Sequence, residues 1–273
     1  MATPVENRMK VGRTELVNGL ERGMVVLQSF SRVSTPMTLS QVARANGLSV
    51  ATARRAVLTL EKMGYLGRNE RRFVLRPSIL SLSAGYLTAV RRPFQPFVEG
   101  IVRELRGSAS IAVLDSDHVI CVAHASKHPT GDVRAGARWP LHATAAGRLL
   151  LSLQPTQAIQ AYLSQGSFRR ATQRTNGTPD GWRTMLRRVR KDHCALVLNE
   201  PHDESLSVAV PIFAPTGSVV AALEWSGVTG ADEAVVRRQH LPVLQRVNHR
   251  IETMLSEFPD LVASLMTSDA SRL

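Results

Sequence analysis

Residues 38–63 read TLSQVARANGLSVATARRAVLTLEKM, and they predict two helices joined by a tight turn. Thr38 followed three residues later by Gln41 is a capping-box pattern, which marks the start of a helix. Gly47 ends this first helix, and Ser49 just after the turn is a good N-cap for the second. A helix, a glycine-containing turn and another helix make up the helix-turn-helix arrangement.

The second of these helices separates into an apolar stripe and a polar side. Ala53, Val57 and Leu60 share one stripe, so they should pack against the preceding helices. Ala53 is small, which suits a close crossing of two helices. The first two turns carry small, hydrogen-bonding and arginine side chains, which suit entry into the major groove of DNA. The residues expected to contact DNA are Ser49, Val50, Ala51, Thr52, Arg54 and Arg55.

A basic hairpin follows this helix and predicts a wing. Runs at 65–68 and 72–75 flank a short turn, and Arg68, Arg71 and Arg72 are expected to contact backbone phosphates. An upstream helix completes the unit, with one apolar face made of Leu20, Met24, Leu27 and Phe30.

A generic three-helix domain would share the helix pair and a basic face. Two N-caps, a tight turn, a small crossing residue and a basic hairpin occur together in this chain, however. Their coincidence favours a DNA-binding winged helix-turn-helix over the generic domain.

The formal net charge of the chain is +12, and its distribution is uneven. Residues 1–90 hold 13 Lys and Arg against 5 Asp and Glu, whereas the remaining residues hold 21 against 17. An excess of positive charge in the first third is expected of a unit that binds a polyanion. Charge alone fits RNA or an anionic membrane as well as DNA.

Neither a membrane span nor a signal peptide is predicted. No apolar stretch approaches the ~18 residues that a membrane helix needs, and residues 1–20 lack the apolar core of a signal peptide. We therefore expect a cytoplasmic protein. Cys121 and Cys194 lie far apart without CxxC spacing, so neither a disulfide framework nor a zinc knuckle is expected.

The sequence predicts a chain of two domains with a helix between them. An arm precedes the first domain, and its Arg8, Lys10 and Arg13 either stay solvated or contact phosphates. The helix between the domains begins near Pro77, and its apolar residues either pair with a second copy of the chain or pack within one chain. The predicted bounds are 1–18 for a flexible arm, 19–76 for the winged helix-turn-helix domain, 77–92 for the linker helix, 93–260 for an effector-binding domain and 261–273 for a tail.

Strands and helices are mixed after Pro93. Apolar runs at 110–114 and 119–123 flank Asp115-Ser116-Asp117-His118, which predicts a hairpin. Further strands are expected at 194–198, 207–213 and 218–225, and helices at 143–153, 155–164, 180–192 and 233–258.

Several motifs together resemble the IclR family of transcriptional regulators over residues 18–256. They are Thr38–Ala43, Leu48–Arg55, Gly136–Pro140, Ala143–Leu150, Ser207–Pro211 and Val219–Leu223. The resemblance is nearest to the branch that governs protocatechuate, 4-hydroxybenzoate and β-ketoadipate catabolism. It implies an α+β chain with a winged helix-turn-helix, a linker helix and a GAF-like α/β effector domain, which binds operator DNA as a dimer or a dimer of dimers.

The resemblance also implies an effector pocket in the second domain. Carried over residue by residue, the pocket is formed by Thr144, Ala145, Ala146, Ser207, Glu224 and Ser226. A helix that starts near Ala143 offers free N–H groups, which suit the carboxylate of a small organic acid, with aromatic acids among the candidates. Arg138 and His142 could add charge or hydrogen bonds.

This sequence departs from the family pattern in and near the pocket. Leu198-Asn199-Glu200 stands where the family has an acidic run, and Glu204 stands where a glycine is usual. Glu224 replaces a small polar residue. An ionised Glu224 would repel a carboxylate effector unless an arginine neutralises it.

No nucleophile elbow, Walker or dinucleotide motif occurs, so neither a catalytic residue nor a cofactor is predicted. His118, His124 and His128, with Asp115 and Asp117, lie in a turn and a loop rather than on one face, and no metal is expected there.

Two alternatives to a ligand-responsive regulator stay open. One is an enzyme acting on a small aromatic acid, with His142 and Glu224 in acid–base roles. The other is an architectural DNA-binding protein that responds to no effector.

Overall fold

The computed structural model describes residues 17–31, 35–127, 134–164, 178–198, 205–228 and 233–266. The chain forms two compact units, Met1–Gly85 and Tyr86–Leu273. The predicted arm residues Arg8, Lys10 and Arg13 lie outside the described residues.

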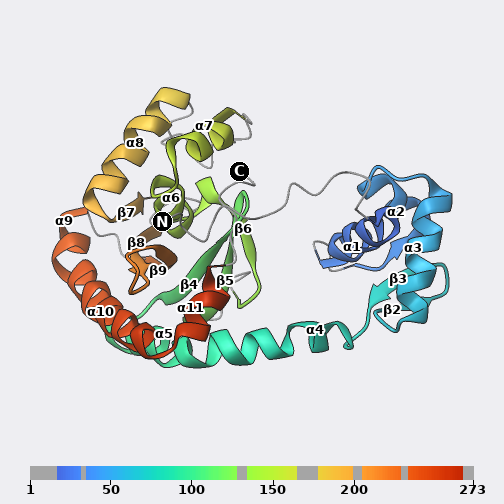
Figure 1. Ribbon diagram of the computed structural model, residues 1–273, viewed down its shortest axis with the longest axis horizontal. Coiled ribbons are helices and arrows are strands. Elements are labelled where there is room, and N and C mark those ends of the chain that lie inside the picture. The colour runs from blue at the N-terminus through green and yellow to red at the C-terminus, as the bar shows by residue number, and fades with distance from the viewer. Residues whose placement is uncertain are drawn as a thin grey trace, which may run out of the picture. The chain divides into compact units, whose positions relative to one another are not determined.

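The N-terminal unit contains the predicted helix-turn-helix and wing (Figure 1). Both predicted N-caps are confirmed. The Thr38 hydroxyl accepts the Gln41 amide at 3.3 Å while the Gln41 side chain accepts the Thr38 amide at 2.8 Å, and the Ser49 hydroxyl accepts the Thr52 amide at 3.2 Å. The elements are α1 (Asn18–Ser31), β1 (Met37–Thr38), α2 (Leu39–Ala45), α3 (Val50–Lys62), β2 (Leu66–Asn69) and β3 (Arg72–Leu75).

The core of this unit uses only part of the face predicted for α1. Leu27 and Phe30 are buried, but Leu20 is 65% exposed and Met24 is 46% exposed. The prediction that these two residues face the core is therefore wrong. The short helix α2 and the stripe of α3 fill the core without them, because Ala53, Val57 and Leu60 are all buried as predicted.

A continuous helical run leads from the first unit into the second. It comprises α4 (Ile79–Tyr86), a wide π-helical turn η1 (Leu87–Arg91) and α5 (Arg92–Leu105), so it begins two residues after Pro77. The sequence did not predict α5, which contains Pro93 and Pro96. A π-type turn immediately before Pro93 relieves the clash that a proline ring makes inside a regular helix.

The C-terminal unit is built on a six-stranded antiparallel sheet in the order β6-β5-β4-β9-β8-β7. All five predicted strands are present, and the edge strand β6 was not predicted. The strands are β4 (Ser108–Asp115), β5 (His118–Ser126), β6 (Arg138–Pro140), β7 (Ala195–Leu198), β8 (Ser205–Phe213) and β9 (Val219–Val228).

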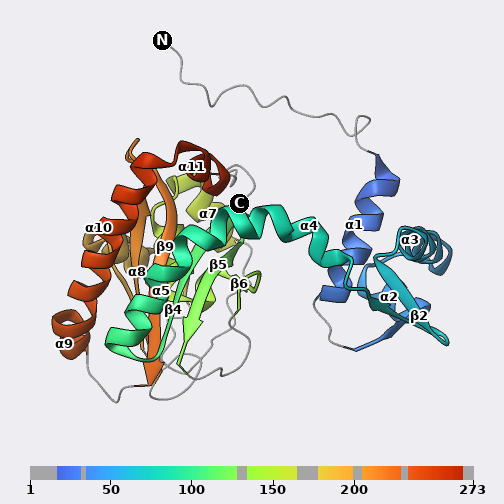
Figure 2. The same ribbon diagram turned by 90° about the horizontal axis from the view of Figure 1, so that it is seen from below.

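Helices cover both faces of this sheet (Figures 1 and 2). Helices α5 and α10 (Leu241–Glu257) pack on one face, where Phe94, Ile101 and Trp225 are buried. The other face carries η2 (Leu141–Ala143), α6 (Ala145–Ser152), α7 (Thr156–Ser164) and α8 (Pro179–Asp192). These positions confirm the predicted helices at 143–153, 155–164 and 180–192.

The last described residues form a helix that packs against the core, and they do not form a free tail. The predicted helix at 233–258 appears as α9 (Glu233–Val235), a π-helical turn η3 (Val236–His240) and α10. A further helix, α11 (Pro259–Leu265), buries Leu261, Val262 and Leu265 against the core. The predicted tail from residue 261 therefore begins too early, because three apolar residues in the first part of it complete the core.

Candidate functional site

The first turns of α3 present the predicted DNA-contacting side chains to solvent. Val50, Ala51, Arg54 and Arg55 are exposed and Thr52 is half-buried, whereas Ala53 between them is fully buried. The exposed Ser49 side chain is engaged as the N-cap and also donates to the Thr52 hydroxyl at 2.9 Å. The predicted separation of the two faces is therefore present in the structure.

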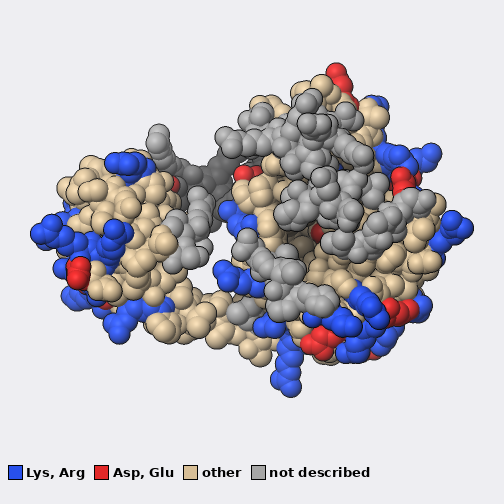
Figure 3. All heavy atoms as spheres, turned by 180° about the vertical axis from the view of Figure 1, so that it is seen from behind, with Lys and Arg blue, Asp and Glu red and all other residues tan. Residues whose placement is uncertain are grey.

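The three wing arginines are not equivalent. Arg68 forms a two-bond contact with Glu61 at 2.8 and 3.1 Å and stacks on Phe73, so part of its charge is neutralised. Arg72 donates to the Pro36 carbonyl at 3.1 Å. Arg71, at the tip of the hairpin, has no described partner and is exposed. On the face of this unit seen in Figure 3, Lys and Arg side chains outnumber acidic ones.

The N-terminus of α6 in the second unit is capped by side chains. The Thr144 hydroxyl accepts the Gly147 amide at 2.9 Å, and Oε2 of Glu224 accepts the Ala146 amide at 2.8 Å. Ala145 and Ala146 are fully buried. The helix start predicted near Ala143 is thus close to its true position, and Glu224 on β9 lies directly beside it.

Seven half-buried polar residues form a patch on the sheet face that carries α6. In the first row, Ser110 on β4 pairs with Glu224 on β9 and with His124 on β5. In the next row, Ser108 on β4 pairs with Ser226 on β9 and with Ser126 on β5. Ser226 in turn pairs with Ser207 on β8. The rest of this face is apolar and packs under α6 and α8. We call Ser108, Ser110, His124, Ser126, Ser207, Glu224 and Ser226 the polar patch.

Glu224 has an unusual electrostatic environment. Burial raises the pKa of its carboxyl from 4.5 to about 7, although the Ala146 amide, the charge of Arg148 and the Ser207 hydroxyl oppose the rise. The sequence left open whether an arginine neutralises this carboxylate. The positive charge of Arg148, near the start of α6, offsets part of the negative charge of Glu224.

Two other predicted effector residues lie outside the patch. Arg138 is on the edge strand β6, three strands away from β9, and its guanidinium pairs with Asp115 at 3.1 Å and Asp117 at 3.7 Å. His142 hydrogen-bonds through Nδ1 to the Tyr162 hydroxyl at 2.9 Å. The structure therefore brings Ser207, Glu224 and Ser226 together with the start of α6, but it does not bring Arg138 to them.

Sequence reasoning missed four members of the patch. Ser108, Ser110 and Ser126 were not singled out, and His124 was considered only as a metal ligand. The alternation of Ser108 and Ser110 within an apolar strand was the available signal, because it puts two hydroxyls on one face of the sheet.

The histidines considered for metal binding are separated. His118 pairs with the adjacent Asp117 at 2.6 Å, His124 belongs to the patch, and His128 lies outside the described residues. No group of three or more potential metal ligands occurs in the described ranges. In the same part of the chain, no helix combines the length and hydropathy that crossing a membrane requires.

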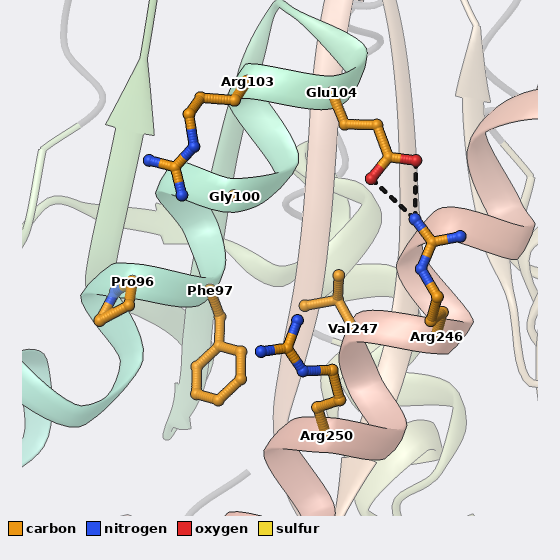
Figure 4. A pocket seen from close by; sticks show the side chains of 8 residues that line it. All are labelled: Pro96, Phe97, Gly100, Arg103, Glu104, Arg246, Val247 and Arg250. Atoms are coloured by element: carbon orange, nitrogen blue, oxygen red, sulfur yellow. Dashed lines mark hydrogen bonds and ion pairs between the residues drawn. The ribbon is translucent and has the colours of Figure 1, made fainter.

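A groove of about 370 Å³ lies between α5 and α10, on the other side of the sheet from the polar patch (Figure 4). Arg246 in its wall pairs with Glu104 at 2.6 Å, and Arg250 lies over the Phe97 ring. None of its lining residues was predicted to bind an effector.

The first unit is a winged helix-turn-helix that exposes one helix, and the second is a sheet domain whose polar patch lies beside a helix N-terminus. These two features define a DNA-binding regulator with a ligand-binding domain. Two family models match the chain: the IclR helix-turn-helix domain over residues 19–70, and the C-terminal domain of the bacterial IclR transcriptional regulators over residues 86–250. The chain belongs to the IclR family. It binds DNA through the first domain and a small molecule through the second.

Similar proteins agree with this assignment. The Pca operon regulatory protein of Acinetobacter baylyi is 30% identical, over 91% of this chain and 93% of that protein. The Pca regulon regulatory protein of Pseudomonas putida is 28% identical, over 85% of this chain and 82% of that protein. An IclR homologue from Microbacterium hydrocarbonoxydans, solved in complex with 4-hydroxybenzoate, has a TM-score of 0.70 at 25% identity and covers 88% of this chain and 100% of that one.

These findings decide between the alternatives. The relatives are transcriptional regulators and not enzymes, which argues against acid–base catalysis by His142 and Glu224. The match to the C-terminal domain of the family likewise argues against an architectural protein without an effector.

Proposed function

We propose that this regulator controls genes of aromatic-acid catabolism and that a small organic acid of this class changes its affinity for operator DNA. Support comes from the two Pca regulators and from the p-hydroxybenzoate hydroxylase transcriptional activator of Acinetobacter baylyi, which is 28% identical over 89% of this chain and 94% of that protein. A regulator that binds chromosomal operators would act in the bacterial cytoplasm.

The observation that carries the proposal is the polar patch. A sheet face covered by helices is normally apolar, whereas this face carries half-buried polar side chains in two adjacent rows. The start of α6 lies directly beside the patch. We place the effector there, in contact with Thr144, Ala145, Ala146, Ser207, Glu224 and Ser226. The pairing of Arg138 with Asp115 does not support a role for it in the same site.

Operator binding should depend on the exposed arginines of α3. Arg54→Ala and Arg55→Ala are each expected to weaken specific binding, by about 1–3 kcal/mol for an arginine that contacts a base. The melting temperature should barely change because both side chains are exposed. Fluorescence anisotropy with an operator fragment and with unrelated DNA measures the specific part of the affinity.

Lys62→Ala is the matched control, since it removes a positive charge from the far end of the same helix. Its effect on operator affinity should be small. Wild-type affinity in both arginine variants would show that α3 does not contact the bases.

In the same titration, a saturating aromatic acid should change operator affinity, and the operator must change the affinity for the acid by the same factor. An unchanged operator affinity with every aromatic acid tested would refute the sensing role.

We also propose that the protein is a homodimer or a dimer of dimers. Two exposed apolar faces have no partner within the described chain: Val17, Leu20 and Met24 at α1, and Leu82 and Tyr86 at α4. Contiguous exposed apolar residues are typical of protein interfaces. A two-fold dimer would require a pseudo-palindromic operator, with half-sites about 34 Å apart or at a multiple of that spacing.

The double variant Leu20→Lys, Leu82→Lys should therefore dissociate the assembly. Sedimentation of the wild-type chain should give two or four times 29.9 kDa, and the variant should give the monomer mass. Ser81→Lys is the control, because it adds a charge at an exposed polar position of the same helix and should leave the mass unchanged. A wild-type chain that sediments as a monomer and protects one asymmetric half-site would contradict the dimer.

A further inference from the structure

The groove between α5 and α10 combines positive charge with an apolar floor (Figure 4). Arg103 and Glu104 line it from α5, and Arg246 and Arg250 line it from α10. Three arginines against one glutamate leave an excess of positive charge in the lining. The volume of about 370 Å³ falls within the range of small-molecule sites, so the groove has the size and the charge for a small anion.

Two of the three arginines are not neutralised. Arg246 donates to both carboxylate oxygens of Glu104, at 2.6 and 2.7 Å. Arg103 and Arg250 form neither an ion pair nor a hydrogen bond with any described residue, and both are exposed. One guanidinium from each helix is therefore available to donate to a ligand.

The floor of the groove is flat and apolar. Val247 is buried and Phe97 is partly buried. Gly100 adds no side chain, and the nearest atom to the place of its missing Cβ is a guanidinium nitrogen of Arg103, at 3.8 Å. The Arg250 guanidinium lies 5.6 Å from the centre of the Phe97 ring. An aromatic ring beside a planar cation is a surface on which the flat ring of a ligand stacks.

A phosphate group fits the two available arginines better than a carboxylate does. A carboxylate has one negative charge and two oxygens, which a single guanidinium satisfies in a bidentate pair. The phosphate of a monoester carries a charge of about −1.5 to −2 near pH 7 and has three acceptor oxygens. It therefore accepts hydrogen bonds from two arginines at once.

We propose that the groove between α5 and α10 is a second ligand site, which binds a phosphate monoester with a flat ring, such as a nucleotide. The phosphate group accepts from Arg103 and Arg250, and the ring lies on Phe97. This site is on the other side of the sheet from the polar patch, so it does not depend on the proposed aromatic effector. Helix α5 continues through η1 into α4, so the ligand contacts the helical run that joins the two units.

AMP, adenosine and inorganic phosphate separate the two parts of the proposed ligand. Calorimetry with the full chain should show that AMP binds at least tenfold more tightly than either adenosine or inorganic phosphate. Arg103→Ala and Arg250→Ala should each lower the affinity for AMP about fivefold. Phe97→Leu keeps an apolar side chain but removes the ring, so it should weaken the binding of AMP about fivefold and leave that of inorganic phosphate unchanged.

Two further variants sharpen the test. Glu104→Gln removes the charge that neutralises Arg246, so it should raise the affinity for AMP about threefold. Arg187→Ala removes an exposed arginine from α8, on the other side of the sheet, and should leave the affinity for AMP unchanged.

The inference is wrong if AMP does not bind, if adenosine or inorganic phosphate binds as tightly as AMP, or if both arginine variants keep the wild-type affinity for AMP. A loss of operator affinity in Arg103→Ala and Arg250→Ala, without binding of AMP, would instead assign these arginines to the phosphates of DNA and overturn the inference. In each of these cases the proposed function stands, because it rests on the polar patch.

Discussion

Gly147→Ala is expected to destabilise the C-terminal unit strongly, although it adds a single methyl group within a helix. A Cβ atom at this position would lie 2.2 Å from the carbonyl oxygen of Leu141 and 2.7 Å from its Cα. These are backbone atoms, so no side-chain rotation relieves the clash, and α6 must move away from η2. The movement also pulls the Ala146 amide from Glu224. We expect a loss of about 3 kcal/mol, seen as a fall of about 10 °C in the melting transition of this unit by calorimetry.

Gly100→Ala is the matched control for this prediction. It is the same substitution in a helix of the same unit, and its Cβ would meet nothing closer than 3.8 Å, at the end of the flexible Arg103 side chain. Replacing a helical glycine by alanine there should stabilise the unit by up to about 1 kcal/mol. Equal melting temperatures for the Gly147 variant and the wild-type chain would show that η2 and α6 are not so closely packed.

Ala53→Glu should unfold the N-terminal unit and abolish operator binding. Ala53 is completely buried in the core that α3 shares with α1 and α2. A glutamate there needs volume that the crossing does not have, and it places an unpaired charge in an apolar core. The expected cost is about 4 kcal/mol or more, which is a large part of the stability of a small domain.

The neighbouring substitution Arg54→Glu separates folding from DNA contact. It also introduces a glutamate into α3, but at an exposed position, so the unit should melt at the wild-type temperature. Operator binding should still be lost, because a negative charge would then face the phosphates. If Ala53→Glu leaves both the melting of the N-terminal unit and operator affinity intact, the packing described for α3 is wrong.

The helix-turn-helix was predictable because its signals are local. The Thr38–Gln41 capping box and the Ser49 cap each act within one helical turn, so the residues that set the ends of α2 and α3 are adjacent in the sequence. The separation of Ala53 from Arg54 and Arg55 follows from the helical period alone. Apolar runs on either side of a short polar turn likewise predicted the hairpin of β4 and β5 in the second domain.

The same local signals failed where a partner or an unusual turn was involved. Leu20 and Met24 continue the apolar stripe of α1 by spacing, yet they are exposed, because spacing does not say how far the core extends. Helix α5 was not predicted because it contains Pro93 and Pro96, which normally interrupt a helix. The turn that precedes it is π-helical, and its Phe94, Val98 and Ile101 are buried against the sheet.

The polar patch depends on the pairing of distant strands. The hydroxyls of Ser108 and Ser226 lie 2.8 Å apart although the residues are 118 positions apart in the sequence. A shift of one residue in the register of β4, β9 or β8 would turn that strand's patch residues to the opposite face, and no local pattern fixes that register. The resemblance to a family supplied Ser207, Glu224 and Ser226 as candidates, but only the folded sheet placed them beside His124 and the start of α6. Sequence patterns thus settled the local elements of the DNA-binding domain, whereas long-range pairing set the chemistry of the ligand site.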